Sequence, residues 1–123
     1  MRKRATIAGV LELDETSFEE AVAGGPLVVD FWAPWCRPCL AIEPILEELQ
    51  ARVRVARLNI DEHPAIASRY SVLSIPTVML FADGEPRGSL MGARPQAHFD
   101  RWLAEVLPAA ELEGLSAQRH DDA

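Results

Sequence analysis

The sequence lacks the features of a membrane protein, a nucleic-acid-binding protein or a multidomain chain. Its 123 residues are enough for one globular domain, and no apolar run approaches the roughly 18 residues that cross a bilayer. Acidic residues outnumber basic ones by 19 to 12, and the net charge of -7 opposes binding to a phosphate backbone. The basic start MRKRATIAG has no apolar stretch of the signal-peptide kind. We therefore expect a cytoplasmic protein that binds neither nucleic acid nor a membrane.

Cysteine is also scarce, because the chain has only Cys36 and Cys39, three positions apart in the segment WCRPC. Two cysteines do not build a disulfide scaffold in a cytoplasmic chain. A structural zinc site needs four ligands, and beyond this pair the chain offers three histidines without ligand spacing. Zinc between subunits and two buried structural thiols remain as alternatives. We favour a redox pair and expect no metal site.

Apolar runs and turn residues predict the order of strands and helices. Strands are expected over residues 6–13, 27–33 and 53–60, and on both sides of Asp83-Gly84, which is a strong hairpin signal. Helices are expected where apolar residues recur on one face, over residues 17–23, 36–52, 61–70 and 95–107. Helices between the first strands indicate parallel pairing, and the hairpin adds antiparallel strands. The fold class is therefore α/β, with a mixed sheet sandwiched by helices.

Local signals mark where these helices begin, bend and end. Thr16 and Glu19 have the spacing of a capping box, and Asp61 is expected to open the third helix. Pro44 should kink the second helix, because its ring removes a backbone donor and crowds the preceding turn. Pro108 should end the last one. We expect a flexible N-terminus over residues 1–7 and a mobile tail over residues 108–123.

The cysteine pair falls where the strand 27–33 ends and a helix begins. At that point the sulfur of Cys36 meets unpaired backbone N–H groups and the positive end of the helix dipole, which favour a thiolate. Cys39 lies on the same face of the first turn, within reach of a disulfide. Pro38 stiffens the loop between them. The two sulfurs can therefore close a small ring.

Five motifs together resemble the thioredoxin family over roughly residues 8–107. WCRPC follows the strand LVVDFWA, and VARLNID, SIPT and FADGEPRGSLMGA come after it in matching order and spacing. The resemblance implies a thioredoxin fold, which is a five-stranded mixed sheet with four helices, and thiol–disulfide exchange in electron transport and cell redox homeostasis. It also implies no bound cofactor. The partners it implies are disulfide-containing client proteins and a thioredoxin reductase, which is an NADPH-dependent flavoprotein. We expect the protein to be a monomer.

The resemblance assigns roles to the residues around the dithiol. Cys36 resembles the attacking nucleophile of the family, and Cys39 resembles its resolving thiol. The resemblance implies a disulfide between Cys36 and Cys39. Asp30, alone in an apolar run, is expected to have a raised pKa and to accept the proton of Cys39. Its alternative is a satisfied buried carboxylate without a catalytic part. Arg57 stands where the family commonly has a lysine that tunes this aspartate, and its alternative is a solvated strand arginine.

A groove for an extended client is implied around the dithiol. Pro76 resembles the family's cis-proline, which lets the backbone of Ile75 hydrogen-bond a client, and Trp32 is either part of the site or only packing. Other apolar lining residues are expected at Trp35, Met91, Gly92 and Ala93.

Three positions depart from the family pattern. Arg37 replaces a glycine between the cysteines, and with Pro38 it is expected to tune the redox potential. Leu40 replaces a frequent basic residue and Ser74 a frequent glycine, which affects partner preference. We favour a protein-disulfide reductase. The alternatives are a non-catalytic binding subunit or holdase, which has no use for an intact dithiol, and a disulfide donor, which needs an oxidising compartment.

Overall fold

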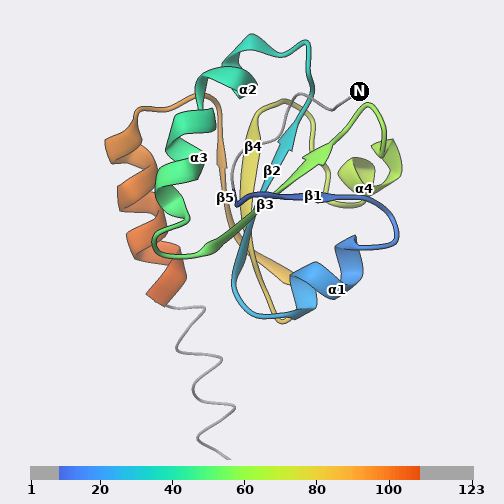
Figure 1. Ribbon diagram of the computed structural model, residues 1–123, viewed down its shortest axis with the longest axis horizontal. Helices are drawn as coiled ribbons and strands as arrows, with labels where there is room; N and C mark the ends of the chain where they lie inside the picture. Colours follow the sequence, from blue (N-terminus) through green and yellow to red (C-terminus); the bar gives the residue numbers. More distant parts are fainter. Residues whose placement is uncertain (1–8, 109–123) are drawn as a thin grey trace, which may run out of the picture.

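The computed structural model describes residues 9–108, and the predictions for the N-terminus and for the tail beyond residue 108 lie outside this range. Within it, five strands form one mixed sheet in the order β1-β3-β2-β4-β5. β1, β3 and β2 are parallel, whereas β4 and β5 are antiparallel to their neighbours. This is the predicted α/β arrangement (Figure 1), with strands at β1 (Leu11–Leu13), β2 (Leu27–Trp32), β3 (Arg54–Asn59), β4 (Thr77–Ala82) and β5 (Glu85–Met91).

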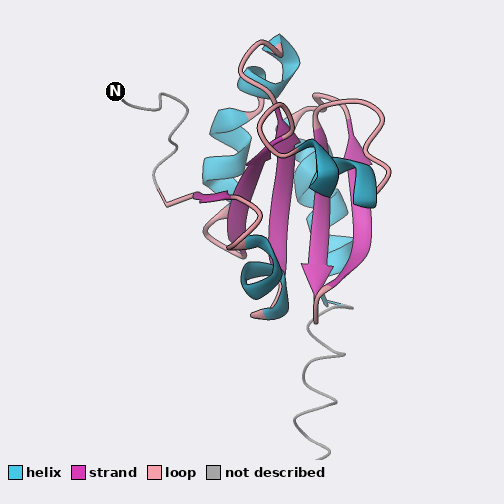
Figure 2. Cartoon of the chain, turned by 90° about the vertical axis from the view of Figure 1, so that its right-hand side faces the viewer, coloured by secondary structure: helices cyan, strands magenta, loops and turns pink. Residues whose placement is uncertain are grey.

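Helices cover both faces of this sheet (Figure 2), as the sequence predicted. α3 and a C-terminal helix over residues 96–108 lie on one face, α1 and α4 on the other, and α2 at the end of β2 (Figure 1). The described residues thus contain five helices rather than the expected four: α1 (Phe18–Ala23), α2 (Arg37–Ala41), α3 (Glu43–Leu49), α4 (Pro64–Arg69) and the C-terminal helix.

The extra helix arises at Pro44, where one kinked helix was predicted. Ile42 ends α2 and also precedes α3, and Pro44 stands in the first turn of α3. A proline has no N–H to donate to the Leu40 carbonyl, so the helical ladder is interrupted there and restarts. The proline therefore divides the helix and gives the two halves different directions (Figure 1).

Each face of the sheet has its own apolar core, and β2 contributes to both by alternation. Every residue of β2 is buried. Val28 faces α3 and the C-terminal helix, whereas Val29 and Phe31 face α1 and α4. Since side chains alternate along a strand, Asp30 and Trp32 lie on the Val28 side. The carboxyl of Asp30 therefore lies on the face of the sheet that α3 and the C-terminal helix cover.

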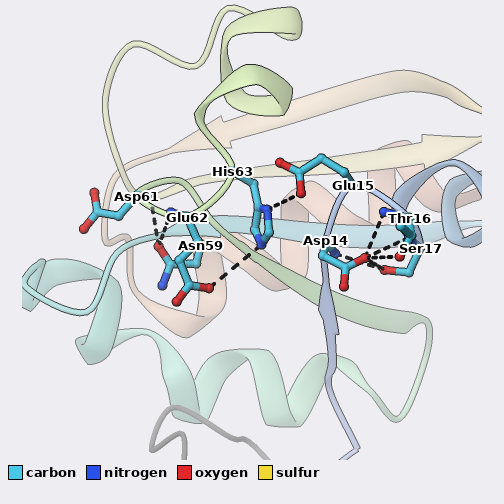
Figure 3. Close-up of polar contacts among 8 residues, drawn as sticks. All are labelled: Asp14, Glu15, Thr16, Ser17, Asn59, Asp61, Glu62 and His63. Atoms are coloured by element: carbon cyan, nitrogen blue, oxygen red, sulfur yellow. Dashed lines mark hydrogen bonds and ion pairs between the residues drawn. The ribbon is translucent and has the colours of Figure 1, made fainter.

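Two predicted helix starts differ in the structure. The capping box at Thr16 and Glu19 is wrong: the Asp14 carboxylate instead accepts hydrogen bonds from the backbone and hydroxyl groups of Thr16 and Ser17 at 2.8 to 3.1 Å (Figure 3). These bonds, led by the Thr16 hydroxyl, lower the pKa of Asp14 to about 2. Asp61 does not open α4, because the residue preceding that helix is His63. Short acidic side chains compete for nearby backbone donors in turns, which moves the boundary.

The remaining boundaries follow the predictions within a few residues. Asp83 and Gly84 both have positive φ, 55° and 81°, as a tight two-residue hairpin between β4 and β5 requires. β1 is shorter than predicted, beginning at Leu11. The C-terminal helix still includes Pro108, where it was expected to have ended.

Candidate active site

Cys36 and Cys39 form a disulfide at the start of α2, with their Cα atoms 5.2 Å apart. Cys36 is the residue preceding the helix, and its sulfur accepts a hydrogen bond from the backbone N–H of Cys39 at 3.2 Å. Pro38 stands in the first turn, where its missing donor is not needed. Cys39 is fully buried, whereas 4% of Cys36 is exposed. A client can therefore reach the pair only from the Cys36 side.

Asp30 is fully buried on β2, the strand that precedes this pair. Trp32, two residues further along β2 on the same face, forms one buried cluster with Ala33 and both cysteines. Neither carboxyl oxygen of Asp30 accepts a hydrogen bond from the described residues. Burial raises the pKa of Asp30 to about 7, although attraction to Arg57 lowers it in part. The catalytic part of Asp30 stays a prediction, with a purely structural buried carboxylate as its alternative.

Arg57 is also fully buried, so the alternative of a solvated strand arginine is wrong. It pairs with Asp30 across β2 and β3, and its Nε lies 3.4 Å from the Asp30 carboxylate. Its guanidinium carbon lies 3.7 Å from the ring centroid of Trp32. Trp32 therefore contacts both the buried cluster that holds the two cysteines and, through a cation–π contact, Arg57 of the Asp30–Arg57 pair. A buried charge of this kind requires paired partners, and Glu43 and Glu12 supply two more carboxylates.

A cavity of about 520 Å³ opens beside Cys36. Two of its lining side chains are strongly exposed, Trp35 at 67% and Leu73 at 94%. The wall is apolar apart from Arg37, Ser74 and the cysteine: Trp35, Cys36, Arg37, Pro38, Ile60, Val72, Leu73, Ser74 and Ile75. An apolar surface left open beside a reactive sulfur is suited to docking a client segment.

Trp35 is fixed by a contact that the sequence did not predict. Its Nε1 donates a hydrogen bond to Asp61 at 2.8 Å. The turn holding Asp61 is in turn formed by the side-chain oxygen of Asn59, which accepts the backbone N–H of Asp61 at 2.9 Å (Figure 3). The end of β3 therefore orients the aromatic wall of the cavity.

The loop before β4 forms the opposite wall. The Ile75–Pro76 peptide bond is cis, and the Pro76 carbonyl accepts a hydrogen bond from the Gly92 N–H at 2.9 Å. The Ser74 hydroxyl lies 3.9 Å from the sulfur of Met91. Met91 and Gly92 therefore lie beside the Ser74–Pro76 loop, but they do not line the cavity itself, and neither does Ala93.

Residues 9–108 offer neither a cluster of metal-binding side chains nor a membrane-spanning helix. No group of three or more histidine, cysteine, aspartate or glutamate side chains is arranged there to hold a metal ion. No helix in that range is long and apolar enough to span a bilayer.

Comparison with known proteins agrees with this geometry. The family model for thioredoxin matches residues 9–105. A thioredoxin of Alicyclobacillus acidocaldarius subsp. acidocaldarius is 41% identical over 102 residues, covering 79% of this chain and 97% of that protein. A thioredoxin of Staphylococcus aureus (strain Mu50 / ATCC 700699) is 40% identical, covering 80% and 94%. A solved structure of a mutant thioredoxin from Halobacterium salinarum NRC-1 superposes with a TM-score of 0.74 at 30% identity, covering 85% and 96%.

A mixed five-stranded sheet that presents a dithiol at the start of a helix defines a thiol–disulfide oxidoreductase. The chain belongs to the thioredoxin family. Its activity is the reduction of protein disulfides by dithiol–disulfide exchange through Cys36 and Cys39.

Several residues of this site were not predicted from the sequence, including Ile60 and Val72 in the wall of the cavity. Asp61 contacts Trp35, Glu43 contacts Arg57, and Leu73 stands at the rim of the cavity. Leu73 could have been found, since an apolar residue in a turn before SIPT has no helix or strand to bury it. The contacts of Asp61 and Glu43 join different elements, so no local pattern indicates them.

Proposed function

We propose that Cys36 is the nucleophile and Cys39 the resolving thiol. The Cys36 thiolate attacks a client disulfide, forms a mixed disulfide and releases the first client thiolate. Cys39 then loses its proton, attacks the sulfur of Cys36 and releases the second client thiolate. The client gains two electrons, and the protein is left with the Cys36–Cys39 disulfide. The single observation that carries this assignment is that Cys36 alone of the pair reaches the surface, beside an open apolar cavity.

Asp30 is proposed to accept the proton that Cys39 loses. Its burial and its raised pKa, about 7, support this role, because a base with a pKa near the working pH both takes and returns protons readily. Arg57 limits how far burial raises that pKa, so it tunes Asp30 rather than touching the sulfurs. In the next cycle Asp30 gives its proton to solvent.

Client proteins are proposed to dock as extended segments over the cavity. Trp35 and Ile75 contribute apolar surface, with Pro76, Met91, Gly92 and Ala93 continuing the groove beyond the cavity. Arg37 is exposed beside Cys36, where its charge stabilises a thiolate and attracts acidic clients. Pro38 keeps the turn between the cysteines rigid.

The electrons are proposed to come from an NADPH-dependent flavoprotein, a thioredoxin reductase, which reduces the Cys36–Cys39 disulfide after each turnover. The chain itself then needs no bound cofactor. We place the protein in the cytoplasm because a disulfide reductase works where a reductant keeps its dithiol reduced. Because its net charge is -7, we expect it not to bind nucleic acid. We also expect a monomer, with the exposed apolar wall of the cavity left open for clients.

Mixed-disulfide trapping tests the roles of the two cysteines. Reduced Cys39→Ser, incubated with insulin as a disulfide-containing probe, should accumulate a covalent complex on non-reducing gels, because the resolving thiol is absent. Cys36→Ser should form none, since Cys39 is buried. Trapping by Cys36→Ser but not by Cys39→Ser would reverse the assignment. Binding that persists without both cysteines would instead favour the holdase alternative.

A further inference from the structure

Arg57 is the centre of a buried charge cluster to which four elements contribute. It lies on β3, its cross-strand neighbour Asp30 on β2, Glu12 on β1 and Glu43 at the start of α3. Arg57 and Asp30 are fully buried, whereas the side chains of Glu43 and Glu12 are 23% and 37% exposed. Three carboxylates thus surround one cation, and the position of the guanidinium decides which of them it stabilises most.

The contacts of Arg57 favour Glu43 over Asp30. Its terminal nitrogen donates a hydrogen bond to Glu43 at 3.1 Å. Its Nε lies 3.4 Å from the Asp30 carboxylate, without the alignment of a hydrogen bond, and another nitrogen lies 3.9 Å from Glu12. Charge-assisted hydrogen bonds are the stronger contacts, so the guanidinium is directed toward α3.

We propose that Glu43 is a positioning residue for the dithiol reaction: it holds the Arg57 guanidinium by a hydrogen bond, and Asp30 therefore keeps enough affinity for a proton to accept it from Cys39. The inference rests on the proton-accepting role proposed for Asp30. If Arg57 were committed to Asp30 alone, the carboxylate would be stabilised as an anion and would be a weaker base. Glu43 acts through Arg57 and touches neither sulfur nor client.

The surroundings of Asp30 support a role for Glu43 in particular. The charged groups that influence it are Arg57, which lowers its pKa, and Glu43 and Glu12, which raise it. On the neighbouring strand β4, the residue paired with Asp30 is Val78, which is apolar. The C-terminal helix contributes apolar side chains to the core on this face, among them Phe99, Trp102 and Leu103. Glu12 is farther from Arg57 and more exposed than Glu43, so solvent screens it more.

The matched variants are Glu43→Gln and Glu47→Gln, which remove the same charge from the same helix. Glutamine at position 43 has no negative charge and accepts a weaker hydrogen bond from Arg57, so the guanidinium is freer to pair with Asp30. Its size and shape are those of glutamate, so the fold should be retained, as circular dichroism would show. Glu47 is exposed on α3 and lies outside the charge cluster of Arg57. Two carboxylates on one guanidinium lie roughly 7 Å apart, where Coulomb's law predicts a pKa change of about half a pH unit to one pH unit.

The experiment is a carbon-13 NMR titration of the Asp30 carboxyl in the disulfide form, beside the pH profile of insulin reduction. Glu43→Gln should lower the pKa of Asp30 by roughly half to one pH unit and move the rise of the rate to lower pH by the same amount. Glu47→Gln should change neither. An unchanged or raised pKa in Glu43→Gln, an equal change in Glu47→Gln, or a moved pKa with an unmoved rate profile would each overturn the inference. Failure of the wild-type protein to reduce insulin would instead count against the proposed function, and the titration would still report the coupling.

Discussion

At the scale of single residues, Asp30 combines the proposed role of proton acceptor with a cost to the stability of the fold. Its carboxyl is fully buried without a hydrogen bond from the described residues, and its only close cation in that range is shared with two other carboxylates. Folding therefore favours the protonated form, and the pKa of Asp30 rises from 3.8 to about 7. An exposed aspartate would avoid this cost but would be a poor base at neutral pH.

Asp30→Asn should therefore stabilise the protein at high pH. Between about pH 4 and pH 7 the folded state binds more protons than the unfolded state, so wild-type stability falls as pH rises and the cost is complete above pH 7. The gain from Asp30→Asn should be up to about 4 kcal/mol larger at pH 8 than at pH 4. Urea unfolding of both proteins in the disulfide form measures it. A difference in stability that does not change with pH would show that Asp30 titrates normally.

At the scale of elements, the packing of the C-terminal helix against β5 depends on the absence of a side chain at Gly88. A Cβ atom built there would lie 2.8 Å from a methyl carbon of Val106 and 3.7 Å from Nε1 of Trp102. The sheet and the helix are therefore closer than two ordinary side chains would allow. This face of the sheet also holds the charge cluster, so the helix helps keep water away from Asp30.

Gly88→Ala should lower the free energy of unfolding by about 1 to 3 kcal/mol, because valine is stiff and the core must shift to admit a methyl group. Val106→Ala removes the clashing methyl group, so the cost of Gly88→Ala should be smaller in that background. A double-mutant cycle by urea unfolding gives this coupling directly. Equal costs in both backgrounds would mean that the helix does not contact β5 at Gly88.

The elements could be predicted from the sequence more fully than their ends or their contacts. The apolar runs predicted β2 and β3, and Asp83-Gly84 predicted the hairpin, because these signals are local. The capping box failed because Asp14, two residues before Thr16, took the donors. At Pro44 the sequence predicted one kinked helix, whereas the structure has two separate helices, α2 and α3. The burial of Arg57 depends on its register with β2 and on α3, which one sequence does not reveal.

At the scale of the whole molecule, the fold places a reactive pair at the edge of a rigid scaffold. The two cores fix the central strand β2, whose end leads directly into α2 and the cysteines. The dithiol thus lies near the surface, while its proposed proton acceptor, Asp30, is buried in the sheet. The sequence drew attention to Cys36 and Cys39 because they are its only two cysteines, and to Asp30 because it interrupts an apolar run. The contacts of Asp30 with Arg57 and of Arg57 with Trp32 became visible only in three dimensions.

The reduction potential of the Cys36–Cys39 pair tests the central claim, that the chain is a disulfide reductase, most directly. Thioredoxin has a potential of about -270 mV, which serves here as the reference value for the family. The exposed charge of Arg37, roughly 7 Å from the Cys36 sulfur, favours the reduced form by about 0.8 kcal/mol at an effective dielectric constant of about 60, and raises the potential by at most about 15 to 20 mV. Equilibration of the purified protein with glutathione buffers of known poise should therefore give a value between about -270 and -250 mV. A potential above about -180 mV, in the range of disulfide donors, would contradict the account.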